Sequence, residues 1–213
     1  MCPWLCSPRY FSAASVFSNR TRNHPFFQAR LCRLARRMMP DCTMFTIGHS
    51  TRSIADFVSL LHARDIELLA DVRTAPRSRR NSQFNTENLA PCLATASIAY
   101  VQLPALGGWR RPRANSPNTG WRHASFRGYA DYMMTADFRN ALDGLIALGC
   151  EQRLAFMCAE AVPWRCHRSL IADALVARGY DVRHIVSATK ADSHRMTPFA
   201  RVEGGSVTYP PLP

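Results

Sequence analysis

The chain has 213 residues, and its 27 lysine and arginine side chains against 15 aspartate and glutamate side chains give a net charge of +12. This length supports one sizeable hydrophobic core, and no apolar run reaches the roughly 20 residues of a membrane helix. A basic chain favours a polyanionic partner such as nucleic acid. Because Lys190 is the only lysine, arginine-biased coding is an alternative source of the charge.

The first 43 residues differ in composition from the rest of the chain. They hold seven arginines but one acidic residue, Asp41, and without them the net charge falls to +6 (20 basic against 14 acidic side chains). A segment rich in serine and arginine and poor in acids is similar to an organelle transit peptide. The favoured alternative is a start assigned too early, because a strand pattern begins at Met44. We therefore expect residues 1–43 to be a disordered leader or to precede the true start, at Met38, Met39 or Met44.

The cysteines do not form a disulfide pattern. Four of the eight lie within residues 1–43, and the others, Cys92, Cys150, Cys158 and Cys166, lack the spacing of a disulfide framework. Reduced thiols are the default in the cytoplasm. The cysteine usage therefore predicts a cytoplasmic protein with free thiols.

From Met44 onward, strand patterns alternate with helical patterns. The predicted strands are Met44–Gly48, Ile66–Val72, Ala99–Leu103, Arg153–Cys158 and Asp181–Val186. The predicted helices are Ser53–Ile66, Asn85–Ala99, Tyr129–Leu148 and a helix from Cys166 or His167 to Arg178, closed by Gly179. Ser53 is expected to cap the first helix, and Pro91 should delay the regular part of the second to about Ala90. Thr135 should start a new helix that ends at Gly149.

Two segments interrupt or follow this alternation. Residues 104–128 are rich in glycine, proline, tryptophan and arginine, and a loop of this length is either functional or disordered. The Gly204-Gly205 pair predicts a small hairpin within Ala200–Tyr209. Strands separated by helices favour right-handed crossovers and a parallel sheet. The expected fold is α/β: residues 44–213 form a single three-layer, Rossmann-like domain with a mostly parallel sheet of about five strands and a small C-terminal hairpin.

Chemically distinctive residues follow four of the five predicted strands. In an open parallel sheet the ligand lies beyond the carboxyl ends of the strands, so these residues should meet at one edge. In chain order they are His49, Ser50, Thr51 and Arg52; Asp71 and Arg73; Gly107 and Gly108; and Cys158, Glu160, Cys166, His167, Arg168 and Ser169. The last group spans a predicted helix N-terminus, where free amides and the helix dipole favour anions and lower the pKa of a thiol.

These residues suggest roles in catalysis and in ligand binding. Cys158 is the candidate nucleophile, and Glu160, Asp71 and His49 are candidate proton carriers. The others are candidate ligand-binding residues: Ser50, Thr51, Arg52, Arg73, Gly107, Gly108, Cys166, His167, Arg168 and Ser169. The arginine forks suit phosphate or carboxylate.

Each assignment has a structural alternative. Cys158 and Cys166 can be small buried hydrophobic residues, and Asp71 can be a structural partner of Arg73. His167 can be a surface residue in the first turn of the helix. A zinc ion on Cys158, Cys166 and His167 is not expected, because seven residues separate the cysteines and no second ligand pair has a standard spacing.

The segment from Cys158 to Arg168 resembles the active loops of rhodaneses and cysteine phosphatases. In those proteins a cysteine at a strand end precedes a loop and an arginine at the following helix, and rhodaneses also carry "DVR" on an earlier strand. The loop is longer in this chain and contains Pro163 and Trp164. It cannot form the same tight ring of amides, so sulfur transfer or phosphate-ester hydrolysis is an analogy only.

A closer resemblance extends from Met44 to Tyr209. The motifs "TIGHSTRS", "DVRTAPRSRRNSQFN", "LPALGG", "SFRGYADYM", "MCAEAVPWRCHRSLIADAL" and "TPFARVEGGSVTYP" resemble, in order, those of the bacterial domain-of-unknown-function family 488. The resemblance implies an α/β domain starting near Met44. It also implies that the strand-end residues belong to shared motifs, and it implies no activity and no cofactor for them.

Two functions remain open on the sequence. The favoured one is a small cytoplasmic enzyme that binds a phosphate-bearing ligand, a nucleotide or nucleic acid, at the carboxyl edge of the sheet, because acids and a thiol are unnecessary for simple phosphate binding. The alternative is a non-catalytic nucleic-acid-binding module in which loop arginines meet phosphates while Trp109 and Trp121 stack on bases. Its arginines would be Arg77, Arg79, Arg80, Arg110, Arg111 and Arg113. Neither reading involves a membrane.

Overall fold

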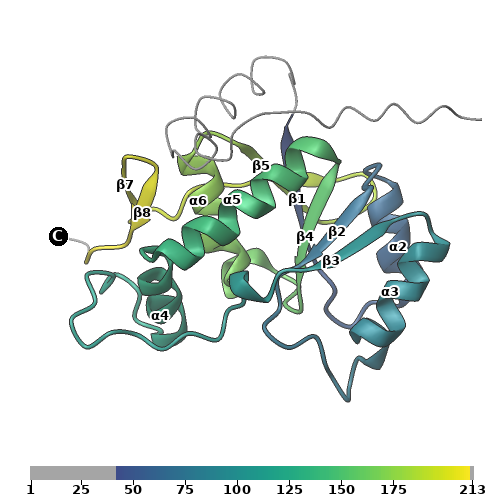
Figure 1. Ribbon diagram of the computed structural model, residues 1–213, viewed down its shortest axis with the longest axis horizontal. Coiled ribbons are helices and arrows are strands. Elements are labelled where there is room, and N and C mark those ends of the chain that lie inside the picture. Colours follow the sequence, from purple (N-terminus) through teal and green to yellow (C-terminus); the bar gives the residue numbers. More distant parts are fainter. Residues whose placement is uncertain (1–41, 212–213) are drawn as a thin grey trace, which may run out of the picture. The chain divides into compact units, whose positions relative to one another are not determined.

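The computed structural model describes residues 42–211, which form an α/β fold around a six-stranded sheet (Figure 1). The strands lie in the order β3-β2-β4-β1-β5-β6. Their bounds are β1 (Thr43–Gly48), β2 (Leu68–Asp71), β3 (Ala99–Gln102), β4 (Leu154–Cys158), β5 (Asp181–Ile185) and β6 (Ala191–Ser193). All neighbours pair in parallel except β5 and β6. The predicted α/β class with a mostly parallel sheet is confirmed, whereas the predicted leader lies outside the described residues apart from its last two positions.

Helices cover both faces of this sheet (Figure 1). Helices α2 (Ile54–His62) and α3 (Thr86–Thr95) lie on one face, and α5 (Ala136–Glu151) and α6 (Arg168–Ala177) lie on the other. Helix α4 (Ala124–Met133) packs near α5 and near the hairpin of β7 (Arg201–Glu203) and β8 (Ser206–Thr208). The sheet and the helices on its two faces therefore make the predicted three layers, with buried apolar side chains between the sheet and each helical layer. Among the helices of residues 42–211, none combines the length and apolarity needed to span a bilayer.

The residues of β4 alternate between the two faces of the sheet. Ala155 and Met157 belong to the core under α2 and α3, whereas Phe156 and Cys158 belong to the core under α5 and α6. This period of two follows from strand geometry, and a strand buried on both faces is typical of a parallel sheet. Cys158, the last residue of β4, therefore lies on the side of the sheet that α6 covers.

The two central strands, β4 and β1, define a topological switch point. After β1 the chain crosses through α2 on one face, and after β4 it crosses through α6 on the opposite face. The carboxyl ends of both strands lie side by side, since Gly48 is paired with Cys158 in the register of the sheet. In open α/β sheets, ligands bind outside the carboxyl ends of strands at such a point. The topology therefore places the Cys158 segment where an α/β protein generally binds its ligand.

Several local predictions are confirmed by backbone geometry and hydrogen bonds. The Ser53 hydroxyl accepts a bond of 3.0 Å from the Asp56 amide at the start of α2, and the Thr135 hydroxyl accepts one of 3.2 Å from the Phe138 amide at the start of α5. The hairpin turns at Gly204 and Gly205, whose φ angles are +55° and +80°. These positive φ angles favour glycine.

Helix boundaries near a proline and a glycine were predicted incorrectly. Helix α3 begins at Thr86, directly after the predicted first residue Asn85, but it is regular from there rather than from about Ala90. It ends at Thr95 rather than at Ala99, and Pro91 lies inside it on an exposed face. Because proline has no amide hydrogen, the carbonyl oxygen of Glu87 loses its helical hydrogen bond. Glu87 lies in the first turn of the helix, where water can satisfy this oxygen. Helix α5 continues past Gly149 to Glu151. A Cβ on Gly149 would lie 3.0 Å from the Met44 side chain, so this glycine allows the helix to pack closely on β1 rather than ending it.

The segment predicted as a long loop, residues 104–128, contains two helical stretches. A 3-10 turn, η2 (Pro104–Leu106), follows β3, and α4 begins at Ala124 instead of Tyr129. The His123 ring nitrogen accepts a hydrogen bond of 3.3 Å from the Ser125 amide, which caps α4 without a serine, threonine or aspartate signal. The short antiparallel strand β6 was not predicted, because its sequence, "ADS", has no apolar alternation.

A chain of hydrogen bonds crosses the core on the α6 side of the sheet. Thr46 Oγ1 lies 2.9 Å from His184 Nδ1, His184 Nε2 lies 2.9 Å from His194 Nδ1, and His194 Nε2 lies 2.7 Å from Asp173 Oδ1. Asp173 also accepts the Tyr209 hydroxyl at 2.8 Å. The chain connects β1, β5 and α6 with the C-terminal segment, and its polar groups are satisfied by one another.

We expect the protein to lose stability as the pH falls through the range in which His184 titrates. Burial, with the nearby positive charges of His194 and Arg168, lowers the pKa of His184 from 6.5 to about 4, and Asp192 and Asp173 oppose the shift. Since the folded pKa lies below the unfolded pKa, the unfolded state binds more protons in this window, and stability present above about pH 6.5 declines toward about pH 4.

Urea unfolding at about pH 7 and about pH 4.5 measures this effect. We expect the free energy of unfolding of the wild-type protein to decrease by roughly 1–3 kcal/mol between these two pH values. The decrease should be smaller in His184→Gln. His62→Gln, which changes an exposed histidine, is the matched control and should keep the wild-type pH dependence. An unchanged pH dependence in His184→Gln would contradict the assignment.

Candidate active site

Two thiols and an imidazole meet at the switch point. Cys158 ends β4, and Cys166 and His167 immediately precede α6 after the 3-10 turn η3 (Pro163–Arg165). The His167 Nδ1 atom lies 3.6 Å from the Cys166 sulfur and 3.9 Å from the Cys158 sulfur, and all three atoms lie within 4.8 Å of one another. The two cysteines are buried and His167 is half-buried. We call these three residues the thiol–imidazole cluster.

The tautomer of His167 follows from its other ring nitrogen. Nε2 lies 3.0 Å from the carbonyl oxygen of Val72, and a carbonyl oxygen can only accept a hydrogen bond. Nε2 therefore carries the proton, and the lone pair of Nδ1 faces the two sulfurs. The backbone of Gly108 lies against the ring, where a Cβ would be 2.5 Å from Nδ1, and the Tyr129 ring centroid is 5.1 Å away. The imidazole is thus held in one orientation.

The two thiols have different acidities. Interaction with Cys166, followed by burial, raises the pKa of Cys158 well above its ordinary value. Interaction with Cys158, assisted by His167 and Arg168, lowers the pKa of Cys166 well below its ordinary value. These directions make Cys166 the more acidic of the two thiols, whereas the sequence predicted Cys158 as the nucleophile. The role of Cys158 as nucleophile remains a prediction.

A second polar unit lies beside the cluster, at the ends of β1 and β2. The carboxylate of Asp71 accepts a bond of 2.8 Å from Nε of Arg73 and one of 2.8 Å from the hydroxyl of Tyr100. Both Asp71 and Arg73 are buried. Burial raises the pKa of Tyr100 to about 12, which keeps this hydroxyl protonated as a donor. The structural pairing of Asp71 with Arg73 that the sequence left open as an alternative is present.

His49 belongs to the same unit. Its Nδ1 donates to the Ser50 carbonyl oxygen at 2.8 Å, and its Nε2 faces Nη1 of Arg73 at 3.3 Å. The ring stacks on Phe84 with a centroid distance of 4.2 Å. Burial lowers the pKa of His49 to about 4, so the neutral ring accepts a hydrogen bond from Arg73. Its proton-carrying role stays a prediction, since both ring nitrogens have partners within the protein.

Arg168 points into the protein. Its Nη1 donates to Thr46 at 2.8 Å and its Nη2 to the carbonyl oxygen of Glu160 at 2.7 Å, and the side chain is 1% exposed. Nε is buried without a hydrogen-bond partner. The Ser169 amide donates to the Cys166 carbonyl oxygen at 3.0 Å. Apart from Nε of Arg168, these donors, which were predicted to bind an anion, have protein acceptors. Their anion-binding role remains a prediction.

The other predicted residues occupy the surrounding backbone. The Glu160 side chain is exposed, while its carbonyl oxygen lies so close to Gly48 that a Cβ there would be 1.7 Å away. The Ser50 amide donates to the Ala159 carbonyl oxygen at 2.8 Å, Thr51 is exposed, and Arg52 donates to the Gly48 carbonyl oxygen. At Gly107, a Cβ would lie 2.3 Å from the Thr74 hydroxyl oxygen.

The two polar units are connected through the backbone. The His49 amide donates to the Cys158 carbonyl oxygen at 3.0 Å, and Val72, which accepts the His167 proton, lies between Asp71 and Arg73 in the chain. The carboxyl edge of the sheet thus brings together residues that follow β1, β2, β3 and β4. Tyr100 and Thr46 were missed by sequence reasoning, because a tyrosine and a threonine within a strand give no signal of a polar role.

Two tryptophans at this edge are exposed to solvent. Trp109 is 78% exposed and follows Gly108, and Trp164 is 69% exposed and lies in η3, two residues before Cys166. Trp121, predicted to stack on a base, is instead half-buried, with its ring centroid 4.7 Å from that of Phe126. The exposed arginines on the loops after β2, β3 and β4 are Arg77, Arg79, Arg80, Arg111, Arg113, Arg122 and Arg165. Arg110 differs from them, since its guanidinium lies 3.6 Å from the centroid of the Tyr132 ring.

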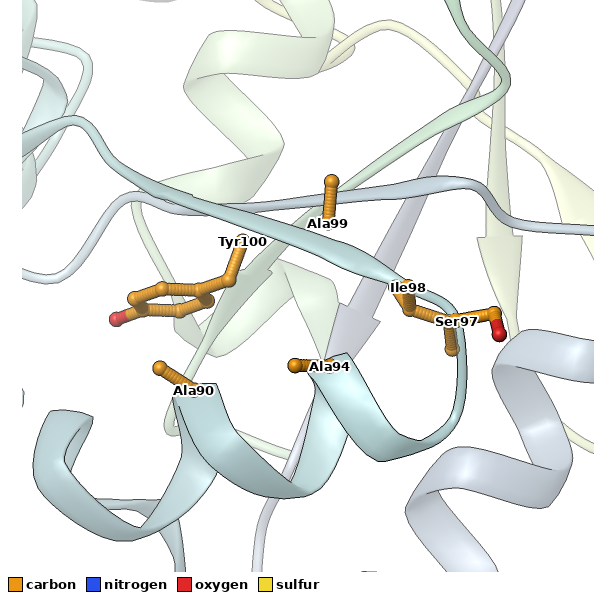
Figure 2. Close-up of a pocket in the computed structure, with 6 residues that line it drawn as sticks. All are labelled: Ala90, Ala94, Ser97, Ile98, Ala99 and Tyr100. Atoms are coloured by element: carbon orange, nitrogen blue, oxygen red, sulfur yellow. The ribbon is translucent and has the colours of Figure 1, made fainter. Parts of the chain in front are cut away.

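A surface depression lies between α3 and the outermost strand β3 (Figure 2). Its volume is ≈ 420 Å³, and it is lined by Ala90, Ala94, Ser97, Ile98, Ala99 and Tyr100. The lining contains no residue of the predicted site. Because it offers mainly small apolar side chains, this depression provides no acid, thiol or imidazole for chemistry.

The protein is thus an α/β protein with a polar site at the carboxyl ends of β1 and β4, the switch point of its sheet. Residues 53–175, more than half of the chain, match the family model described as Domain of unknown function DUF488. The chain belongs to this family, as the motifs in its sequence indicate. No curated protein and no solved structure matches it.

Proposed function

We propose that this protein is an enzyme that acts on a phosphate-bearing ligand, a nucleotide or nucleic acid, at the carboxyl edge of β1 and β4. The observation that supports this proposal is the thiol–imidazole cluster at the switch point, with the Nδ1 lone pair of His167 directed at two buried sulfurs. Reactive groups with strongly shifted pKa values, gathered at the place where the fold binds ligands, are typical of catalytic sites.

The phosphate-binding part of the proposal rests on exposed residues around the cluster. Arg73 and Arg168 are engaged with protein acceptors, so the phosphates are assigned to exposed loop arginines, among them Arg77 and Arg165. The indoles of Trp109 and Trp164 offer surfaces on which bases can stack. Stacking of a base on an aromatic side chain contributes about 1–3 kcal/mol and tolerates any sequence.

The same exposed residues support a second candidate, a non-catalytic module for single-stranded nucleic acid. Arginines that contact phosphates, together with two exposed indoles, are sufficient for such binding and need no thiol. The two candidates differ in one respect. The enzyme requires the thiol–imidazole cluster once the ligand is bound, and the module does not.

Binding of a fluorescent single-stranded oligonucleotide and of nucleotides is the first experiment. Trp109→Ala should weaken binding by about tenfold or more, and Trp164→Ala should act similarly. Val202→Ala, which truncates an exposed apolar side chain in the hairpin, is the matched control and should leave affinity unchanged. Affinity that does not decrease between low and physiological salt would exclude binding through loop arginines.

Turnover then separates the two candidates. A panel of nucleotides and oligonucleotides is incubated with the wild-type protein and products are identified by mass spectrometry. The enzyme predicts that Cys166→Ser and His167→Ala abolish turnover of the converted ligand while its binding persists. Turnover that survives Cys166→Ser, His167→Ala and Asp71→Ala would show that the site is wrong, and binding without any turnover would favour the module.

A further inference from the structure

We infer that the thiol–imidazole cluster is a binding site for one soft divalent metal ion of the zinc type, with the sulfurs of Cys158 and Cys166 and Nδ1 of His167 as ligands. The inference concerns the metal alone and stands whether or not the ligand of the protein is a nucleotide. It reverses the expectation drawn from sequence spacing, in which the seven intervening residues argued against zinc.

The two sulfur–nitrogen distances agree with tetrahedral coordination. Zinc binds thiolate sulfur at about 2.3 Å and imidazole nitrogen at about 2.0–2.1 Å, so a tetrahedral angle requires about 3.6 Å between sulfur and nitrogen. The two observed separations from His167 Nδ1 are 3.6 Å to Cys166 and 3.9 Å to Cys158. The nitrogen therefore already lies within a few tenths of an ångström of the required distance from each sulfur. The two sulfurs lie within 4.8 Å of one another, and on binding they must be about 3.8 Å apart.

The surroundings of the ligands match those of metal sites. A histidine that binds a metal usually donates its other ring proton to a carbonyl or carboxylate, and His167 Nε2 lies 3.0 Å from the Val72 carbonyl oxygen. The Arg168 amide lies 3.5 Å from the Cys166 sulfur, which stabilises negative charge there. Since the ligands lie at the end of β4 and the start of α6, regular elements hold two sides of the site.

Charge also favours a divalent ion once both cysteines are thiolates. On binding, each thiol releases its proton to solvent, and two thiolates with one divalent cation leave the centre neutral. Two isolated thiolates in a buried site would instead carry a desolvation penalty. A disulfide between the cysteines would satisfy the sulfurs but would leave the Nδ1 lone pair of His167 without a partner.

The coordination number has a functional consequence. Three protein ligands leave a fourth position for water or substrate, which is the pattern of catalytic rather than structural zinc. In the metal-bound protein the cysteines are ligands and not nucleophiles. The proposed enzyme would then use metal-assisted chemistry in place of a covalent thiol intermediate.

Metal content tests the inference without any substrate. The full chain is purified without chelators in a phosphine reductant, and bound metals are measured by mass spectrometry. We expect about one zinc per chain in the wild-type protein, and loss of this metal in Cys158→Ser, Cys166→Ser and His167→Ala. Cys92→Ser, which changes a half-buried cysteine of α3, is the matched control and should retain it.

Cobalt substitution provides a second measurement on the wild-type chain, which does not depend on the stability of the variants. Co²⁺ should produce sulfur-to-metal charge-transfer bands and the intense visible bands of tetrahedral coordination. A protein in which Cys2, Cys6 and Cys32 are all changed to serine should give the same spectrum. Absence of these bands and of zinc in the folded, reduced wild-type protein would overturn the inference, as would metal that persists in both Cys166→Ser and His167→Ala.

Discussion

Replacing Gly48 with alanine is expected to destabilise the protein by about 3 kcal/mol or more. The added Cβ would lie 1.7 Å from the carbonyl oxygen of Glu160 and 2.8 Å from Nη2 of Arg168. The nearest atom belongs to the backbone, so no side-chain rotation can relieve the overlap. The loop after β4 must move away from β1, and the hydrogen bond of 2.7 Å between Arg168 and Glu160 is then broken.

Urea unfolding of Gly48→Ala measures this loss, and Gly144→Ala is its control. Gly144 lies within α5, and a Cβ there would meet nothing within 4 Å. Alanine in a helix is favoured over glycine by roughly 0.5–1 kcal/mol, so this control should be slightly more stable than the wild type. If Gly48→Ala and Gly144→Ala changed the free energy of unfolding equally, the close approach of the loop after β4 to β1 would be contradicted.

Removing the charge of Asp71 is expected to reduce the free energy of unfolding by about 3–5 kcal/mol. Asp71 is fully buried and forms an ion pair with Arg73, which is 7% exposed. Asp71→Asn keeps the shape of the side chain but leaves the Arg73 guanidinium buried without a counter-charge. The amide also replaces one acceptor oxygen with a donor, which disfavours the hydrogen bonds from Arg73 and Tyr100.

The control for this substitution is Asp181→Asn, which removes the acid of an exposed ion pair. Asp181 and Arg183 are 43% and 48% exposed. Exposed pairs generally contribute less than about 1 kcal/mol, so the control should remain close to the wild type. Both variants are compared by urea unfolding at about pH 7. A loss below about 1 kcal/mol in Asp71→Asn would show that the Arg73 charge is not confined in a buried pair.

Local signals in the sequence predicted most of the fold. Ser53 and Thr135 mark helix starts through side chains that bond nearby amides, and the Gly204-Gly205 pair marks a turn through its backbone freedom. These effects act within a few residues. Gly149 was misread because its role depends on Met44, far away in the chain, which it approaches closely.

The site was predicted in its location but not in its internal contacts. The parallel topology placed Asp71, Cys158 and His167 at one edge. The direction of each side chain depends on tertiary packing, and for this reason the sequence did not indicate that Arg168 turns inward toward Thr46. The proximity of Cys158, Cys166 and His167 was equally hidden, because it arises from the path of the β4–α6 loop and not from ligand spacing.

The central place of β1 in the sheet sets the minimum length of a fragment that can fold. β1 lies between β4 and β5, yet all of it precedes residue 53, where the family match begins, and β5 follows residue 175, where the match ends. A fragment trimmed to the matched range would expose the flank of β4. It would also lose Thr46, which accepts a hydrogen bond from Arg168, and His194, which is bonded to Asp173. Shortened versions for crystallisation should therefore keep at least residues 43–209.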